Sequence, residues 1–332
     1  MNQRDKFLLQ SAPRRRIVLG ALAAMGASGA SAQSTPASGP IRLVVPFTPG
    51  TGIDMVARQI SPPLGERLGR PFFVDNKAGA SGNIGTAEVV RAAPDGNTLL
   101  VSVNTLVMNP ALYPKIGFDP LTDLTPISLT SRGQLLLVAN AASGIDSLAA
   151  LIARAKARPG LLNYGSPGAG TPHHLAMELL KNRAKLSLTN IAYRGTGPAL
   201  TDLLGGQIEV MFLPIHVALQ HVKSGHLKAL AISSNTPSPL LPAVPPLSSL
   251  NLGDLNVDMW YGVLGPANLP RPFVDRLNKE LGDILKLPAI ATAFETQGMT
   301  PAHSTPEAFK QLMLADAKRW ADLIKAQRIT SE

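Results

Sequence analysis

The chain has 332 residues, a formal net charge of +9 and no cysteine. The lack of cysteine excludes disulfides, a thiolate nucleophile, a cysteine metal site and a lipid-modified cysteine. Aromatic residues make up only 5% of the chain and the basic residues are dispersed, so the composition argues against a nucleic-acid partner. No cofactor is expected.

The first 32 residues have the layout of a signal peptide. Arg14, Arg15 and Arg16 precede an apolar run from Ile17 to Ala30, and a small-residue cleavage site ends at Ala32. The run is shorter than the roughly 20 apolar residues that a membrane span requires. We therefore expect cleavage and export to the periplasm by the Sec or twin-arginine route. Cleavage would remove five cationic residues and one carboxylate, which lowers the net charge to +5.

Strand and helix patterns alternate in the next part of the chain. Residues 41–45 form a short apolar run typical of a buried strand, and apolar residues from Ile53 to Leu64 recur at helical spacing. The same alternation continues with a strand at 72–74, a helix over 83–92 and a strand at 98–103. This order predicts an open α/β sheet.

A second α/β series follows a long apolar stretch at 127–139 and a new helix from Leu148. We expect lobe 1 to comprise residues 33–137 and 260–332, and lobe 2 to comprise residues 138–259. Residues 1–32 are expected to be removed as the signal peptide. Two crossings between lobes predict a hinge that closes around a ligand. The second series has strands near 162–164, 188–192, 210–212 and 229–232, and helices beginning near Pro172, Pro198 and Ile215.

The chain returns to the first lobe at a strand over 259–264. Three prolines, Pro272, Pro288 and Pro306, then introduce the closing helices, because proline suits a first helical turn. Residues 304–307 match a capping box at the start of the last helix.

Three strand-to-helix junctions are rich in glycine and small hydroxyl residues: 48–54, 166–171 and 194–198. Each can direct backbone N–H groups to one point, and a helix N-terminus favours negative charge. Tight turns are the alternative role of these glycines. Asp54 can either cap its helix or contact a ligand, and both roles stay open. The three loops together predict an anion site at the carboxyl ends of the strands.

Signatures of nucleotide and hydrolase sites are incomplete. Met55 occupies the place of the third glycine in a dinucleotide fingerprint. Ser166 lacks the G-x-S-x-G context, because Tyr164 lies two residues before it. A secreted hydrolase that uses Ser166 with His173 or His174 remains the alternative from another class.

Histidine spacing argues against a metal site. His216, His221 and His226 are five residues apart, which turns each about 140° from the last on a helix. His174 and Glu178 share a helix face, but two residues do not complete a site.

Five segments of the chain resemble the substrate-binding receptors of tripartite tricarboxylate transporters, known as Bug receptors. The resemblance extends from about Ile41 to Ile324. It implies a catalytically inactive, two-lobed periplasmic binding protein of the Venus-flytrap type (type II-like) that delivers a carboxylate to two membrane subunits. A monomer is expected. The segments are 46–54, 79–85, 94–98, 166–175 and 193–200.

The resemblance also implies which residues bind the ligand, partly through water. The first lobe would contribute Phe47, Thr48, Thr51, Gly52 and Asp54. The second lobe would contribute Ser166, Gly168, Ala169, Gly170, Thr171, His174, Arg194, Gly195, Thr196 and Leu213.

Two positions depart from the family pattern. Thr51 replaces a glycine of the first loop, and Leu213 stands where many relatives have aspartate. An aspartate would pair with a ligand ammonium group, so Leu213 predicts a ligand without a positive group there. A sensor for a membrane kinase and a structural export protein are further alternatives.

Overall fold

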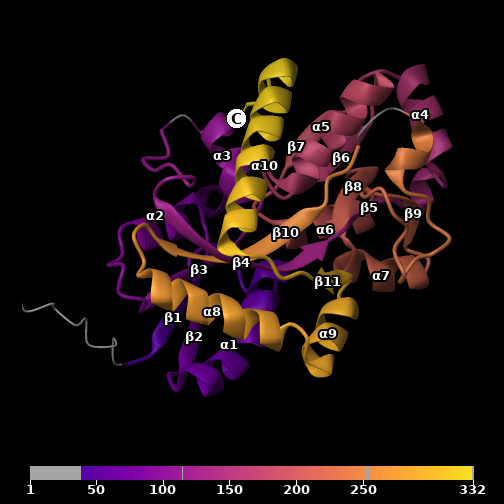
Figure 1. Cartoon of the computed structure of the whole chain (residues 1–332). Coiled ribbons are helices and arrows are strands. Elements are labelled where there is room, and N and C mark those ends of the chain that lie inside the picture. Colours follow the sequence, from indigo (N-terminus) through magenta and orange to yellow (C-terminus); the bar gives the residue numbers. More distant parts are fainter. Residues whose placement is uncertain (1–38, 114, 252–254, 331–332) are drawn as a thin grey trace, which may run out of the picture. The chain divides into compact units, whose positions relative to one another are not determined.

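The computed structural model describes residues 39–113, 115–251 and 255–330. The expected signal peptide, residues 1–32, lies outside the described residues. All described residues belong to one compact unit, Ala37–Glu332. It contains two β-sheets, each with its own helices (Figure 1).

The first sheet has six strands in the order β11-β4-β10-β3-β1-β2. β1 is parallel to β2 and β3, whereas β10 is antiparallel to β3 and β4, and β11 is antiparallel to β4. The strands are β1 (Ile41–Val45), β2 (Phe72–Asn76), β3 (Thr98–Val103), β4 (Leu124–Gly133), β10 (Met259–Pro266) and β11 (Met299–Pro301). Its helices are α1 (Gly52–Leu68), η1 (Ala80–Gly82), α2 (Asn83–Val90), α3 (Thr105–Leu112), α8 (Arg271–Ile284), α9 (Pro288–Glu295) and α10 (Pro306–Gln327).

The second sheet has five strands in the order β7-β6-β8-β5-β9. β6 is parallel to β7 and β8, and β5 is antiparallel to β8 and β9. The strands are β5 (Leu135–Asn140), β6 (Asn163–Ser166), β7 (Thr189–Ala192), β8 (Val210–Pro214) and β9 (Leu227–Ile232). The helices are η2 (Ala141–Ser143), α4 (Leu148–Ala157), α5 (Pro172–Ala184), α6 (Thr196–Leu204), α7 (Ile215–Lys223) and η3 (Leu247–Leu250). We refer to each sheet with its helices as the first and the second lobe.

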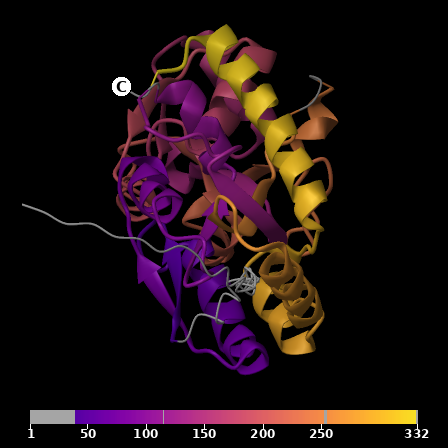
Figure 2. The same cartoon turned by 60° about the vertical axis from the view of Figure 1, so that its left-hand side comes forward.

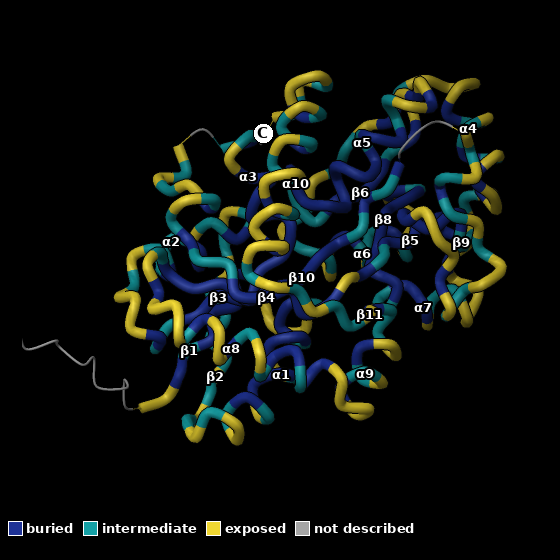
Figure 3. Tube along the Cα trace, viewed as in Figure 1, coloured by how far each residue is buried: buried dark blue, intermediate teal, exposed yellow. Residues whose placement is uncertain are grey.

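Both sheets are covered by helices on two faces, which explains their apolar strands. In β1, Leu43 packs in the cluster that contains the apolar face of α1, whereas Val44 packs with residues of α2, α3 and α10. In β5, Leu137 belongs to the cluster with α5, and Val138 to the cluster with α6 and α7. The dark-blue strands of Figure 3 show this burial. The expected α/β fold with two lobes is confirmed.

The passage between the sheets is short. The apolar stretch at 127–139 is two strands, and Gln134 separates β4 in the first sheet from β5 in the second. β10 returns to the first sheet from Met259. The lobe boundaries expected at 137/138 and 259/260 remain a prediction.

The predicted start of α10 needs a correction. Thr305, not Ser304, is the N-cap, and its hydroxyl accepts a hydrogen bond from the backbone N–H of Ala308. The Ser304 hydroxyl instead accepts from the backbone N–H of Leu129. The prediction of a capping box at 304–307 is therefore wrong, because the Ser304 side chain bonds to β4 instead of to the helix. The expected start of α6 also moves, from Pro198 to Thr196.

Helix α10 contacts elements of both lobes. It packs on β4 and beside α3, and it also touches α5 of the second lobe (Figure 1 and Figure 2). Among the described helices, none is long and apolar enough to cross a membrane.

Candidate functional site

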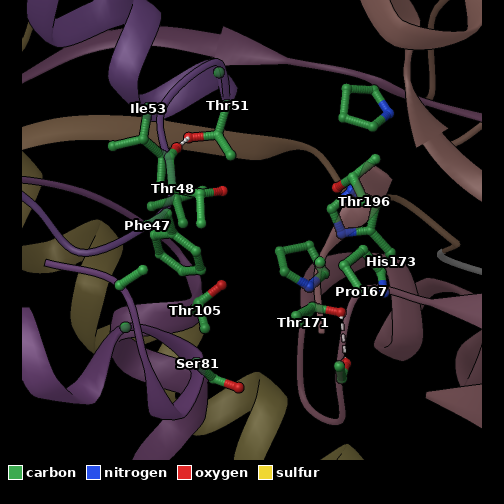
Figure 4. Close-up of a pocket in the computed structure, with 18 of the residues that line it drawn as sticks. Phe47, Thr48, Thr51, Ile53, Ser81, Thr105, Pro167, Thr171, His173 and Thr196 are labelled. Atoms are coloured by element: carbon green, nitrogen blue, oxygen red, sulfur yellow. Dashed lines mark hydrogen bonds between the residues drawn. The ribbon is translucent and has the colours of Figure 1, made fainter. Parts of the chain in front are cut away.

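A cleft of about 810 Å³ is lined by loops from both lobes. Figure 4 shows Phe47, Thr48 and Thr51 of the first lobe on one side, and Pro167, Thr171 and Thr196 of the second lobe on the other. All three glycine-rich loops expected from the sequence reach this cleft. The loops follow β1, β6 and β7, and each leads into the N-terminus of a helix.

Asp54 fixes the first loop from behind. Its carboxylate accepts hydrogen bonds from the backbone N–H of Gly50 (3.0 Å), from Asn76 Nδ2 (3.0 Å) and from Arg58 Nε (2.9 Å). Asn76 Nδ2 also donates to the carbonyl of Phe47. Burial opposes the charge of Asp54, but the bonds from Arg58, Gly50 and Asn76 outweigh it, so the pKa of Asp54 is lowered. These bonds hold the loop in place.

The first turn of α1 is left open toward the cleft. Thr51 is the N-cap, but its hydroxyl donates to the carbonyl of Thr48 (3.0 Å) instead of capping the helix. A Cβ at Gly52 would lie 2.8 Å from both Tyr261 Oη and Met299 Cε. Glycine thus allows the helix to lie close to Tyr261 of β10 and Met299 of β11, and the N–H groups at this end have no side-chain cap, which suits an anion.

The second loop is built around two left-handed glycines, Gly168 (φ +134°) and Gly170 (φ +75°). Thr171, the N-cap of α5, donates to the carbonyl of Gly168 and accepts from the backbone N–H of His174. His174 Nδ1 accepts from the backbone N–H of Gly170 (3.0 Å), and its Nε2 lies 3.9 Å from Glu178. Burial lowers the pKa of His174. Its neutral ring therefore stabilises the loop.

Arg194 is the cation of the third loop. Its side chain is exposed on the cleft wall and forms no hydrogen bond or ion pair with the described residues. Gly195, with φ +134°, is the N-cap of α6 and provides no side-chain cap. Tyr193, also on this wall, donates its hydroxyl to Asp202 (2.8 Å). Burial and this bond raise the pKa of Tyr193 to about 12.

The two lobes touch at one side of the cleft. Ser81 Oγ donates to the carbonyl of Ala169 (3.4 Å) and lies 3.1 Å from Tyr113 Oη. A Cβ at Gly170 would lie 2.0 Å from Leu112 Cδ1. The loop at 78–82 is part of the wall, yet residue types alone did not single it out. The sequence feature that could have indicated this loop is its set of spaced glycines. They belong to the segment 79–85, which resembles the family.

The structure separates the predicted site residues into two groups. The first lines the cleft: Phe47, Thr48, Thr51, Gly52, Gly168, Ala169, Thr171, Arg194, Gly195 and Thr196. The second lies behind the described wall and consists of Asp54, Ser166, Gly170, His174 and Leu213. Leu213 is fully buried among residues of α6 and α7. Contact of either group with a ligand stays a prediction.

Several wall residues were missed because they are distant from the glycine-rich loops in sequence. They are Thr105, Tyr113, His216, Met259 and Tyr261. His173, which directly follows the second loop and was considered only as a hydrolase base, also lines the cleft. Among the residues that line the described cleft, Arg194 is the one guanidinium or ammonium group, and there is no carboxylate. The wall is therefore suited to a negative ligand.

The geometry does not assemble a hydrolase site around Ser166. Its hydroxyl is fully buried and finds no hydrogen-bond partner among the described residues. His174, one of the two candidate bases, is instead bonded to Gly170. The described part of the chain also has no group of three or more histidine and acidic residues that could hold a metal ion.

Two α/β lobes around a cleft lined by helix N-termini define a solute-binding protein of the periplasmic type. The chain belongs to the tripartite tricarboxylate transporter family of receptors, whose family model matches residues 56–329.

Relatives and solved structures agree with this family. The chain is 37% identical to the protein BugT of Bordetella pertussis over 301 residues, which cover 90% of this chain and 92% of BugT. The structure of the periplasmic binding protein BugD is similar, with a TM-score of 0.81 and 30% identity over 88% of this chain and 99% of BugD. An R. palustris protein solved with adipate has a TM-score of 0.83 and 29% identity over 88% of this chain and 98% of its own.

Proposed function

We propose that this protein is a periplasmic receptor that holds a small carboxylate between its lobes and delivers it to the membrane subunits of a tripartite transporter. One observation carries the proposal: the cleft combines the N-termini of α1, α5 and α6 with the unpaired Arg194 and contains no carboxylate among its described lining residues. The adipate complex of a relative supports the same ligand class.

The hydrogen bonds of such a site can provide the binding free energy that a receptor needs. A hydrogen bond to a charged group contributes roughly 1.5–3 kcal/mol, and micromolar affinity requires about 8 kcal/mol. A few bonds from backbone N–H groups and from Arg194 therefore account for much of the affinity. None of these interactions requires a catalytic group, which favours a receptor over an enzyme.

Arg194→Ala tests the carboxylate site. We expect carboxylates to bind roughly 10- to 100-fold more weakly, because one charge-assisted hydrogen bond is lost. Isothermal titration calorimetry with a series of carboxylates measures this directly. Arg158→Ala is the matched control, since Arg158 is exposed and does not line the described cleft. Equal affinity in both variants would remove Arg194 from the site.

The ligand is proposed to lack an ammonium group near β8. Position 213 carries an apolar leucine instead of an acid, so it offers no negative partner. Titration of α-amino acids beside simple carboxylates tests the point, and a preference for the amino acid would contradict it. Turnover of an ester that Ser166→Ala abolishes would support the hydrolase alternative.

A further inference from the structure

Two histidines of the second lobe face the cleft without a function in the anion loops. His173 lies in the first turn of α5, and His216 lies in the first turn of α7. The His173 side chain is only 9% exposed, and neither ring nitrogen has a hydrogen-bond partner among the described residues. His173 thus differs from its neighbour His174, whose ring is bonded to the loop. Buried polar groups without partners are rare and costly.

The surroundings keep both rings neutral when the cleft is empty. Burial, followed by the nearby His216, lowers the pKa of His173 to about 3. Burial also lowers the pKa of His216, although a hydrogen bond with the backbone of Gln297 opposes this. The other titratable groups on the described wall are Arg194 and the phenols of Tyr113, Tyr193 and Tyr261.

Acidic groups close to this region are already engaged. Asp202 accepts from Tyr193, and Glu178 accepts from Tyr164 and Lys181. The described wall itself supplies no carboxylate for the two imidazoles, so a ligand carboxylate can serve as their negative partner. A carboxylate beside an imidazole raises the imidazole pKa, and the helix N-termini of α5 and α7 favour the same charge.

We propose that His173 and His216 form a second anion subsite, which binds the far carboxylate of a dicarboxylate whose near carboxylate lies at the glycine-rich loops. The pair takes up a proton from solvent as the dicarboxylate binds. The ligand class is thereby narrowed from carboxylates to dicarboxylates. This inference rests on the proposed receptor function.

Calorimetry of the mature protein tests the subsite. Dicarboxylates of three to six carbons are compared at pH 7 with monocarboxylates of equal length, for example adipate with hexanoate. Each titration is repeated in phosphate and in Tris, whose different ionisation enthalpies reveal proton transfer. We expect at least one dicarboxylate to bind about 10- to 100-fold more tightly than its monocarboxylate, with net uptake of protons.

The outcomes distinguish the two proposals. If monocarboxylates bind as tightly as dicarboxylates, or if no proton is taken up, the subsite is wrong and the carboxylate receptor stands. If no carboxylate binds at all, the receptor proposal itself is contradicted.

Histidine variants locate the effect. His173→Asn and His216→Asn should weaken the dicarboxylate about 10- to 100-fold and reduce proton uptake, while monocarboxylate affinity changes less than about twofold. His226→Asn is the control, because His226 is exposed and bonded to Ser224. Unchanged dicarboxylate affinity in both cleft variants would overturn the subsite. NMR titration of the imidazole shifts in the unaltered protein gives a readout that does not depend on variant folding.

Discussion

Neighbouring histidines in α5 have different surroundings, although their residue type is the same. His174 Nδ1 accepts a backbone hydrogen bond and holds the second loop, whereas His173 faces the cleft with both nitrogens unpaired among the described residues. Burial lowers the pKa of both. A lowered histidine pKa in the folded state links stability to pH, because the unfolded chain then binds more protons.

We expect the ligand-free protein to lose stability as the pH falls below about 6.5, the ordinary histidine value. Between that value and the folded pKa of about 3, His173 is protonated only in the unfolded chain. It therefore lowers the unfolding free energy by up to about 1.4 kcal/mol per pH unit. Urea denaturation from pH 7.5 to 4.5 measures the slope. His173→Asn should reduce the slope, and an unchanged slope would mean that His173 titrates normally.

At the level of the element, the loop into α1 depends on a helix residue that does not itself line the described cleft. The Asp54 carboxylate accepts hydrogen bonds from the backbone N–H of Gly50, the side-chain amide of Asn76 and the guanidinium of Arg58. These bonds connect the loop, the helix and the end of β2. The loop is thereby held in one shape before a ligand arrives, which reduces the ordering cost of binding.

Asp54→Ala should therefore act through loop order. Loss of the acceptor leaves several donors unpaired, and we expect a destabilisation of about 1–3 kcal/mol. Hydrogen exchange of residues 48–52 should increase, and carboxylate affinity should fall with it. Glu66→Ala provides the control, since Glu66 is an exposed acid of the same helix. Weaker binding with unchanged exchange would instead indicate direct ligand contact by Asp54.

For the whole molecule, one contact between the lobes lies where the second loop meets η1 and α3. Ser81 donates to Ala169, and Gly170 leaves no room for a side chain against Leu112. Leu112 is 4% exposed, so its side chain has little freedom to move away. Ala80 and Ser81 both have positive φ, which costs an L-residue energy and is retained where the surrounding structure requires it.

Gly170→Ala should separate the lobes at this contact. Its Cβ would lie 2.0 Å from Leu112 Cδ1, and we expect a larger radius of gyration by X-ray scattering with carboxylate present, together with weaker affinity. Gly206→Ala is a matched control: its φ of +74° equals the +75° of Gly170 within a degree, but the nearest atom is 4.0 Å away. Both variants bear the same backbone strain, of about 1–2 kcal/mol. Equal scattering and affinity would show that this contact does not control closure.

The sequence by itself determined many of the elements and the three loops, but not α3 or β11. Short apolar runs and helical spacing, together with prolines at helix starts, placed β1, β3, α5 and α10, because these signals lie within a few residues of each other. The resemblance to the receptor family added the prediction that the ligand is a carboxylate. The boundaries of the signal peptide and of the lobes rest on the sequence alone.

Only the tertiary structure decided which side chains face the cleft. Asp54 points behind its loop, Leu213 is in the core, and Thr305 replaces Ser304 as the cap of α10. His173 and His216 line the same cleft although 43 positions separate them in the sequence. Local spacing cannot encode such contacts, because they depend on how distant elements pack against each other. For the same reason, the proposed contact of the ligand's far end with two histidines depends on the N-terminal turns of α5 and α7, which both line the cleft.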